Sequence, residues 1–358
     1  MIPLRATAQR VEMLECGPCA LRSAMRRAGR DDWTAPLADF AVDIVTGALS
    51  LTGATEVLVP ASLVHYVESR RADATLATTS AQRQWPWPAW EAAVEEHRLV
   101  TLVRAQEAAL LINSDLYGGK YSSLCVPVPA GPLVAQLDFG IPVDAFYGEV
   151  LPGVMDAVAA SSRVRWRAWM RSALTCAYEG THVPPIRVAE YTSQLLRQTG
   201  GCERVIWEAA VTGLTPRWLE TASKTALAVG VSPESLALAL PEESSCTARL
   251  LDKSVEVGIT SWTTCAVAES PLYGQASPVA SPESVQLFVT GWNCASAPES
   301  RTCGDGADSD PAEETLEQCC KFVDAVTECT STLVGIREGE KGFKNQASCA
   351  NTTTGPFM

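Results

Sequence analysis

Two cysteines, Cys16 and Cys19, lie close together in the segment LECGPCALRSAM (residues 14–25), at the predicted start of a helix. This spacing fits a redox dithiol, half of a metal site, or a single nucleophile with an incidental neighbour. A nucleophilic cysteine needs its thiolate form, which backbone N–H groups at a helix N-terminus favour. No strand-like run precedes Cys16 to support a redox motif, so the sequence favours Cys16 as a nucleophile.

A cysteine nucleophile also needs a base and a group that orients this base. The chain has three histidines, and His97 is the one predicted at the entrance to a strand, RLVTLVRA (98–105). Asp115 follows a second strand-like run, ALLIN (109–113). In an antiparallel hairpin the start of one strand lies beside the end of its neighbour. The sequence therefore predicts that the side chains of His97 and Asp115 meet.

The order of these residues resembles that of papain-like cysteine peptidases, in particular the double-glycine leader peptidases that process bacteriocins. The similar segments are QRVEMLECGPCAL, WPWPAWEAAVEEHRLVTLV and ALLINSDLYGG, within about residues 5–130. The resemblance implies cleavage of a peptide or protein substrate by nucleophile Cys16, general base His97 and orienting Asp115. It also implies that Gln9 donates a hydrogen bond to the oxyanion.

The secondary structure around these residues predicts an α+β domain over residues 1–150. The resemblance implies that this domain has a papain-like fold. Helical patterns come first, and the strand-like runs follow. The predicted helices are 15–28, 36–45, 61–71 and 88–96. The predicted strands are 98–105, 109–113, 121–128 and 133–139.

Two further regions are expected after this domain. Residues 151–240 are almost wholly helical in pattern and predict a helical bundle domain. Arg163, Arg167 and Arg171 recur every four residues there, as on the exposed face of a helix. Residues 241–358 predict a small, acidic, cysteine-rich β/α region. Its predicted strands are 254–260, 262–268 and 284–291, and its predicted helix is 311–333.

Charge and composition exclude several classes of function. The net charge is −13, and residues 241–358 alone carry 17 acidic and 7 basic side chains, so nucleic acid is not an expected partner. No apolar run reaches the length of a membrane span, and no signal peptide is visible. We therefore expect no membrane association and a cytoplasmic location, or a place within a virus particle or other assembly formed in the cytoplasm.

Eight of the 13 cysteines fall at or after Cys246. None of these eight has the Cys-x-x-Cys spacing, and no histidine follows His182, so no metal and no cofactor are expected. We interpret these cysteines as free thiols.

Two alternatives to the peptidase stay open. The chain could be a non-catalytic structural subunit that retains a peptidase-like fold and assembles with copies of itself and other subunits, as in a virus particle. It could also be a thiol oxidoreductase that uses a Cys16–Cys19 pair.

Overall fold

The computed structural model describes residues 11–76, 87–179, 183–243, 246–267, 270–272, 278–296 and 311–334 of the 358-residue chain. Eight strands close into one barrel in the order in which they occur along the chain. They are β1 (Glu12–Glu15), β2 (Glu56–Pro60), β3 (Leu99–Leu102), β4 (Ser123–Pro129), β5 (Arg165–Thr175), β6 (Arg204–Ala209), β7 (Leu236–Ala239) and β8 (Ser261–Thr264).

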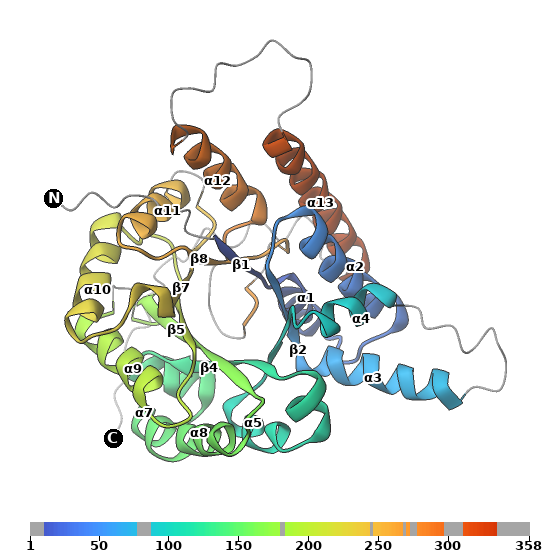
Figure 1. Cartoon of the computed structure of the whole chain (residues 1–358), viewed down its shortest axis with the longest axis horizontal. Helices are drawn as coiled ribbons and strands as arrows, with labels where there is room; N and C mark the ends of the chain where they lie inside the picture. Colours follow the sequence, from blue (N-terminus) through green and yellow to red (C-terminus); the bar gives the residue numbers. More distant parts are fainter. Residues whose placement is uncertain are drawn as a thin grey trace, which may run out of the picture.

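Every neighbouring pair of strands is parallel, including β1 with β8, which closes the barrel. Helices connect each strand to the next and surround the barrel (Figure 1). Parallel neighbours need such crossovers because the chain must return to the end at which it started. The longer ones are α1 (Gly17–Arg27), α2 (Ala35–Leu51), α3 (Ala61–Leu76), α4 (Pro88–Glu95), α5 (Ala105–Ile112), α8 (Leu151–Ala160), α9 (Pro185–Arg197), α10 (Pro216–Ala228), α11 (Thr247–Glu256), α12 (Pro282–Ser296) and α13 (Pro311–Val334).

Proline in the first turn starts many of these helices, because its fixed φ suits that position and its missing N–H costs nothing there. Examples are Pro18 in α1, Pro36 in α2 and Pro152 in α8. The connection between β4 and α8 contains several short helical pieces. It contains α6 (Pro132–Val134), α7 (Val143–Ala145) and two π-helical turns, η2 (Ala135–Phe139) and η3 (Phe146–Val150).

The barrel interior is a packed core. Side chains alternate between the two sides of a strand, and paired residues of parallel strands share a side. Arg167, Trp169 and Arg171 of β5 therefore lie on the inner side, and the Trp169 ring is fully buried. Both sides of β5 are buried, so its sequence does not alternate between apolar and polar residues.

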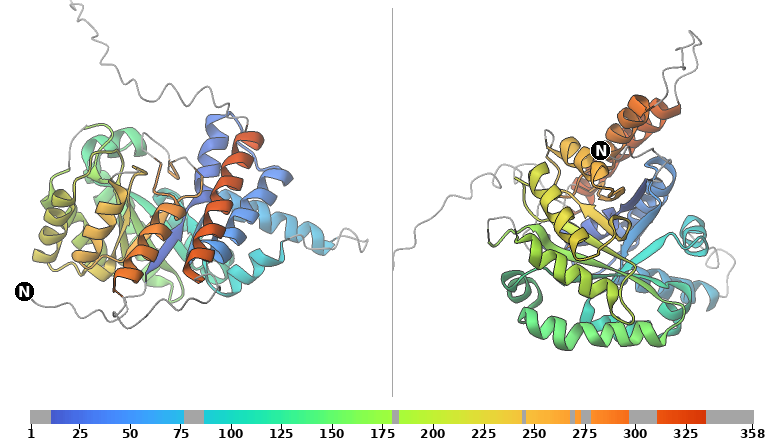
Figure 2. Two further views of the ribbon diagram at one scale, coloured as in Figure 1. Left: turned by 90° about the horizontal axis from the view of Figure 1, so that it is seen from above. Right: turned by 60° about the vertical axis from the view of Figure 1, so that its left-hand side comes forward.

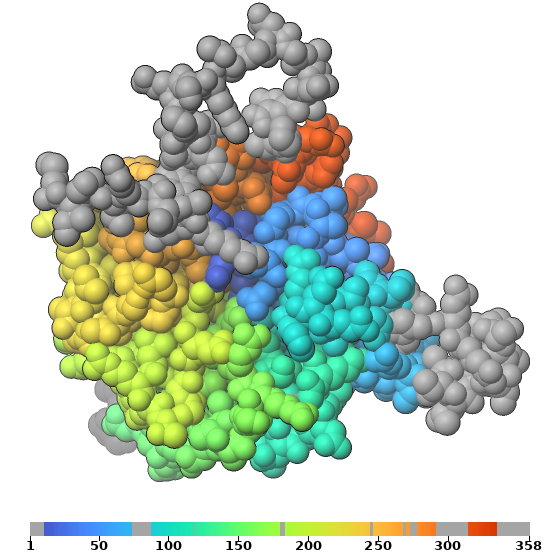
Figure 3. All heavy atoms as spheres, in the orientation of Figure 1, coloured from blue at the N-terminus to red at the C-terminus, as the bar shows by residue number. Residues whose placement is uncertain are grey.

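The last helix, α13, packs on the outside of the barrel against α2 and α12. The red α13 runs beside the blue α2 in Figure 2, and the two form one continuous surface in Figure 3. Phe322 of α13 covers Gly47 of α2 so closely that a Cβ atom on Gly47 would lie 2.2 Å from the ring. Because Gly47 has no side chain, the Phe322 ring can pack directly against the backbone of α2.

The predicted papain-like α+β fold is wrong. Residues 109–113 belong largely to helix α5 instead of a strand, so no hairpin forms, and β3 pairs with β4 in parallel. Residues 133–139 are also helical. The predicted helices at 15–28, 36–45, 61–71 and 88–96 correspond to α1, α2, α3 and α4.

The helical bundle and the separate C-terminal β/α region are wrong as well. β5, β6 and β7 come from residues 151–240, and β8 comes from residues 241–358, so the predicted boundaries near 150 and 240 fall inside one barrel. Residues 284–291 form part of α12, whereas the helix predicted at 311–333 is confirmed as α13. No helix among the described residues is both long and apolar enough to cross a membrane.

Candidate functional site

The predicted nucleophile, Cys16, follows β1 and is completely buried. Its Sγ donates a hydrogen bond to the carbonyl of Thr264 at 2.9 Å. Burial, reinforced by Cys265 and Glu15 nearby, raises the pKa of the Cys16 thiol well above its ordinary value. The helix N-terminus therefore does not yield the thiolate that the sequence led us to expect.

The structure does not bring His97 or Asp115 to Cys16. His97 precedes β3 whereas Cys16 follows β1, so in a parallel barrel they lie at opposite ends. Asp115 lies on the surface between α5 and β4, where it lines a shallow hollow with Arg163. Gln9 lies outside the described residues.

His97 has a structural role instead. Its N–H donates to the carbonyl of Val94 at 3.0 Å, and the N–H of Arg98 donates to that of Ala93 at 2.9 Å. With φ of 55° at His97, these bonds form the Schellman motif that ends α4. The side chain of His97 is exposed.

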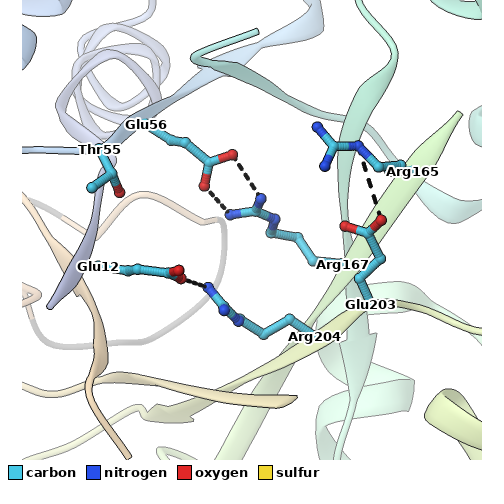
Figure 4. A pocket seen from close by; sticks show the side chains of 7 residues that line it. All are labelled: Glu12, Thr55, Glu56, Arg165, Arg167, Glu203 and Arg204. Carbon is cyan, nitrogen blue, oxygen red and sulfur yellow. Dashed lines mark hydrogen bonds and ion pairs between the residues drawn. The ribbon is translucent and has the colours of Figure 1, made fainter. Parts of the chain in front are cut away.

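Charged side chains fill the end of the barrel at which the strands begin (Figure 4). Arg167 of β5 makes two hydrogen bonds to Glu56 of β2, of 2.7 and 2.8 Å. Arg204 of β6 pairs with Glu12 of β1. These residues, with Thr55, Arg165 and Glu203, line a hollow of about 270 Å³.

Each arginine in this hollow faces a carboxylate, so the formal charges balance. Barrels of this kind carry their chemistry at the opposite end, where the strands finish. We therefore infer that the arginine–glutamate pairs of Figure 4 have a structural role and hold together the strands at this end of the barrel.

A second charged cluster lies at the carboxyl ends of β5 and β6. The Nε of Arg171 donates to Oε2 of Glu208 at 2.8 Å, and its Nη2 lies 3.2 Å from Oδ2 of Asp138. These three side chains are 3–4% exposed. Such a buried guanidinium is withdrawn from water, so it depends on partners such as these carboxylates.

A distortion of β5 shapes this cluster. The pairing of β5 with β6 shifts its register between Met170 and Thr175, and Ser172 has φ of 55°. This left-handed conformation aims the N–H of Ser172 at Oε2 of Glu208, 2.9 Å away. The buried hydroxyl of Ser172 has no hydrogen-bond partner among the described residues. Strained backbone of this kind concentrates at functional sites.

Asp138 reaches the cluster from η2, outside the barrel strands. The hydroxyl of Tyr178 donates a hydrogen bond to Oδ1 of Asp138. Burial raises the pKa of the Asp138 carboxyl, against the opposing effect of Arg171. Oδ2 is close to the guanidinium but poorly aligned for a hydrogen bond.

A third carboxylate, that of Glu15, joins the carboxyl ends of β1 and β8. Its Oε1 accepts hydrogen bonds from the N–H groups of Gly17 and Ala266, each at 2.8 Å. Its Oε2 accepts one from the Thr264 hydroxyl at 2.6 Å. Glu15 thus fastens the two strands that close the barrel.

Across the described ranges, no three Cys, His, Asp or Glu side chains lie together in a way that could hold a metal ion. At the carboxyl end of the barrel, Glu15, Asp138 and Glu208 are each engaged by protein donors or by Arg171. The described carboxylates at this end are therefore not available as ligands for a metal ion.

The closed parallel barrel, its outer helices and the polar cluster at the strand ends define a TIM-barrel protein. No protein-family model and no curated protein matches the sequence. Solved structures match the fold. The HMG-CoA lyase of Brucella melitensis has a TM-score of 0.61 at 14% identity, covering 90% of this chain and 100% of that one.

Two further structures match in the same way. The HMG-CoA lyase of Acinetobacter baumannii, in complex with coenzyme A and 3-methylmalate, has a TM-score of 0.62 at 12% identity, covering 97% and 99% of the two chains. The carboxyl transferase domain of Rhizobium etli pyruvate carboxylase with pyruvate has a TM-score of 0.51 at 11% identity, covering 90% of this chain and 49% of that one.

These matches overturn the peptidase interpretation and the peptidase-like structural subunit, because the shared fold is a TIM barrel and not a papain-like fold. Cys19 does not support a redox pair with Cys16 either, since its thiol points to the carbonyl of Leu58 in β2. The expected absence of nucleic-acid partners stays a prediction.

Sequence reasoning missed Arg171, Glu208 and Asp138. One signal for the first of these was present in RWRAWMR (165–171), where arginine and tryptophan recur at every second position, as inward-facing residues of a strand do. Only the three-dimensional fold brings Glu208 and Asp138 to Arg171.

Proposed function

We propose that this protein binds a small carboxylate substrate at Arg171 and acts as an enzyme of the carbon–carbon lyase or carboxyl-transfer class. The observation that carries this proposal is the position of Arg171, a buried guanidinium at the carboxyl end of a barrel strand. Active sites of TIM barrels lie at this end. The side chain of Asp138 already places one carboxylate beside Arg171, and a substrate carboxylate can replace it.

The two carboxylates that hold Arg171 differ in how firmly they are fixed. Glu208 lies on β6 and accepts a second hydrogen bond from the N–H of Ser172. Asp138 lies on η2 and makes a poorly aligned contact of 3.2 Å with the guanidinium. Asp138 is therefore the partner that a substrate carboxylate can replace, while Glu208 keeps the guanidinium in position.

Arginine suits this role because its planar guanidinium can hold a carboxylate through two parallel hydrogen bonds. In a water-excluded site these bonds strengthen, and they orient the substrate for reaction. Displacement of Asp138 also releases the Tyr178 hydroxyl, which can then donate a proton to the bound molecule.

The reaction class comes from the structural neighbours. Their ligands, 3-methylmalate with coenzyme A in one and pyruvate in another, include small carboxylates. At this low sequence identity, the likeness establishes only the fold for this chain. The experiment below decides between lyase and transferase.

Calorimetric titration of the full chain with pyruvate and with 3-methylmalate, each with and without coenzyme A, tests the proposal. We expect saturable binding of at least one of these carboxylates and a loss of about tenfold or more in affinity for Arg171→Lys, which cannot form the two parallel bonds. The matched control is Arg167→Lys, on the same strand at the other end of the barrel, which should bind as the unaltered chain does.

Asp138→Asn provides the opposite prediction, because it removes the charge that competes for Arg171 and should tighten carboxylate binding several-fold. Incubation of the best ligand with the protein, followed by product analysis, then separates cleavage from carboxyl transfer. The proposal fails if no carboxylate binds, or if Arg167→Lys weakens binding as much as Arg171→Lys does.

A further inference from the structure

A pair of cysteines lies at the seam where the barrel closes. The register of β1 and β8 pairs Glu12 with Ser261 and Glu15 with Thr264. Cys16 and Cys265 each follow the last paired residue, and the N–H of Cys16 still donates to the carbonyl of Thr264 at 2.8 Å. The two cysteines are therefore opposite one another at the carboxyl ends of adjacent strands.

Burial and the neighbouring side chain of Cys265 both raise the pKa of the Cys16 thiol. Each thiol lies close to a backbone carbonyl as well, that of Thr264 at 2.9 Å for Cys16 and that of Val267 at 3.0 Å for Cys265. Cys16 is 0% exposed and Cys265 is 3% exposed, so no solvent separates them. Cys19, although nearer in sequence to Cys16, directs its thiol to β2.

We propose that Cys16 and Cys265 are a site of oxidative modification, at which peroxide forms a disulfide that links β1 to β8. Adjacent strands lie about 4.8 Å apart, which falls within the range of Cα separations that disulfides span. The pair differs from the Cys16–Cys19 pair that the sequence suggested. The modification is independent of carboxylate binding at Arg171.

The reaction balances with hydrogen peroxide as the oxidant. The thiolate of Cys265, the more exposed of the two, attacks one peroxide oxygen, and the O–O bond breaks to give a sulfenic acid and, after protonation, water. Sγ of Cys16 then attacks the sulfenic sulfur, the S–O bond breaks, and a second water leaves. Two thiols lose two electrons and two protons in total, and peroxide is reduced to water.

Burial has two consequences for this modification. Peroxide is about as small as water and can reach the pair during local opening, whereas a disulfide the size of oxidised glutathione is excluded by the packing. The cross-link would join positions that are far apart along the chain, so it should stabilise the folded barrel by restricting the unfolded chain.

Peptide mapping of the peroxide-treated, full-length protein tests the proposal. Trypsin leaves Cys16 and Cys19 together on residues 11–22, and leaves Cys265 with Cys294 on residues 254–301. We expect these two peptides to become linked, with fragment spectra that place the bond at Cys16 and Cys265. The melting temperature should rise by about 5 °C, and reductant should reverse both changes.

Variants separate the possible pairings. Cys265→Ala should abolish the linked peptide, whereas Cys19→Ala and Cys294→Ala, the matched controls, should retain it. A bond between Cys16 and Cys19, or sulfinic acid at either seam cysteine without any linked peptide, would overturn the proposal. Mapping of the unaltered chain is decisive by itself, so the proposal can be tested even if a variant fails to fold.

Discussion

Arg167 and Glu56 join opposite sides of the barrel through two parallel hydrogen bonds, although 111 positions separate them in the sequence. Arg167 is almost fully buried on β5, and Glu56 is the first residue of β2. The pair closes the end of the barrel at which the strands begin (Figure 4). A buried ion pair of this geometry is costly to break on one side only.

We predict that Glu56→Gln lowers the free energy of unfolding by about 2–4 kcal/mol, since it leaves a buried guanidinium without its counter-charge. Urea unfolding followed by circular dichroism measures this change. Glu203→Gln is the control, because its partner Arg165 is half exposed and 3.9 Å away, and it should cost at most about 1 kcal/mol. Equal losses in the two variants would show that the Arg167–Glu56 pair has no special role.

The docking of α13 yields a second prediction. Gly47→Ala should destabilise the protein by about 1–3 kcal/mol, because the new methyl group would overlap the Phe322 ring. In combination with Phe322→Leu, much of this loss should be recovered. Gly153→Ala in α8, where a Cβ atom meets nothing within 4 Å, should instead stabilise by about 0.5–1 kcal/mol. Thermal unfolding of these variants distinguishes overlap from a general effect of removing glycine.

His97 provides a third prediction, since the sequence proposed it as a catalytic base and the structure gives it a left-handed backbone at the end of α4. Because glycine adopts this conformation without strain, His97→Gly should raise the free energy of unfolding by about 0.5–1 kcal/mol. Carboxylate binding should not change in the same variant. A loss of stability on this substitution would mean that the imidazole makes contacts that outweigh the backbone strain.

Glu15 predicts a dependence of stability on pH. Burial raises the pKa of its carboxyl above the ordinary 4.5, so the folded protein holds this proton more tightly than the unfolded chain does. The contribution of Glu15 to stability is therefore fully present below about pH 4.5 and declines as the pH rises through the folded-state pKa.

Comparison with Glu15→Gln isolates this effect. The difference in unfolding free energy between the unaltered chain and the variant should favour the unaltered chain more at pH 5 than at pH 7, as measured by urea titration at both values. A difference that grows toward pH 7 would show that the hydrogen bonds from Gly17, Thr264 and Ala266 outweigh burial.

Helices were the part of this fold that the sequence predicted best. Apolar periodicity, together with proline in the first turn of most of them, indicates α1 to α4 and α13. Strands were harder to recognise, because a parallel barrel buries both faces of its strands and so removes the alternation that marks a strand. In β5 the inward arginines even imitated the four-residue recurrence of a helix.

The candidate site could not be predicted from the sequence. The side chains of His97 and Asp115 were paired on the assumption of a hairpin, but residues 109–113 belong largely to helix α5 and no hairpin forms. His97 precedes β3 and Cys16 follows β1, so the parallel barrel places them at opposite ends. Arg171 and Glu208 come from two strands and Asp138 from the π-helical turn η2, and in the sequence each alone resembles an ordinary surface charge. Their burial depends on contacts that only the closed barrel creates.

The bond between Thr264 and Glu15 spans 249 positions and joins the first strand of the barrel to the last. During synthesis, almost the whole chain of the barrel must therefore leave the ribosome before β8 can pair with β1 and close the sheet. Until then, β1 and β7 each offer unpaired backbone groups to any neighbouring chain. The nascent protein should consequently depend on chaperones late in translation, and truncations that end just before β8 should aggregate rather than fold.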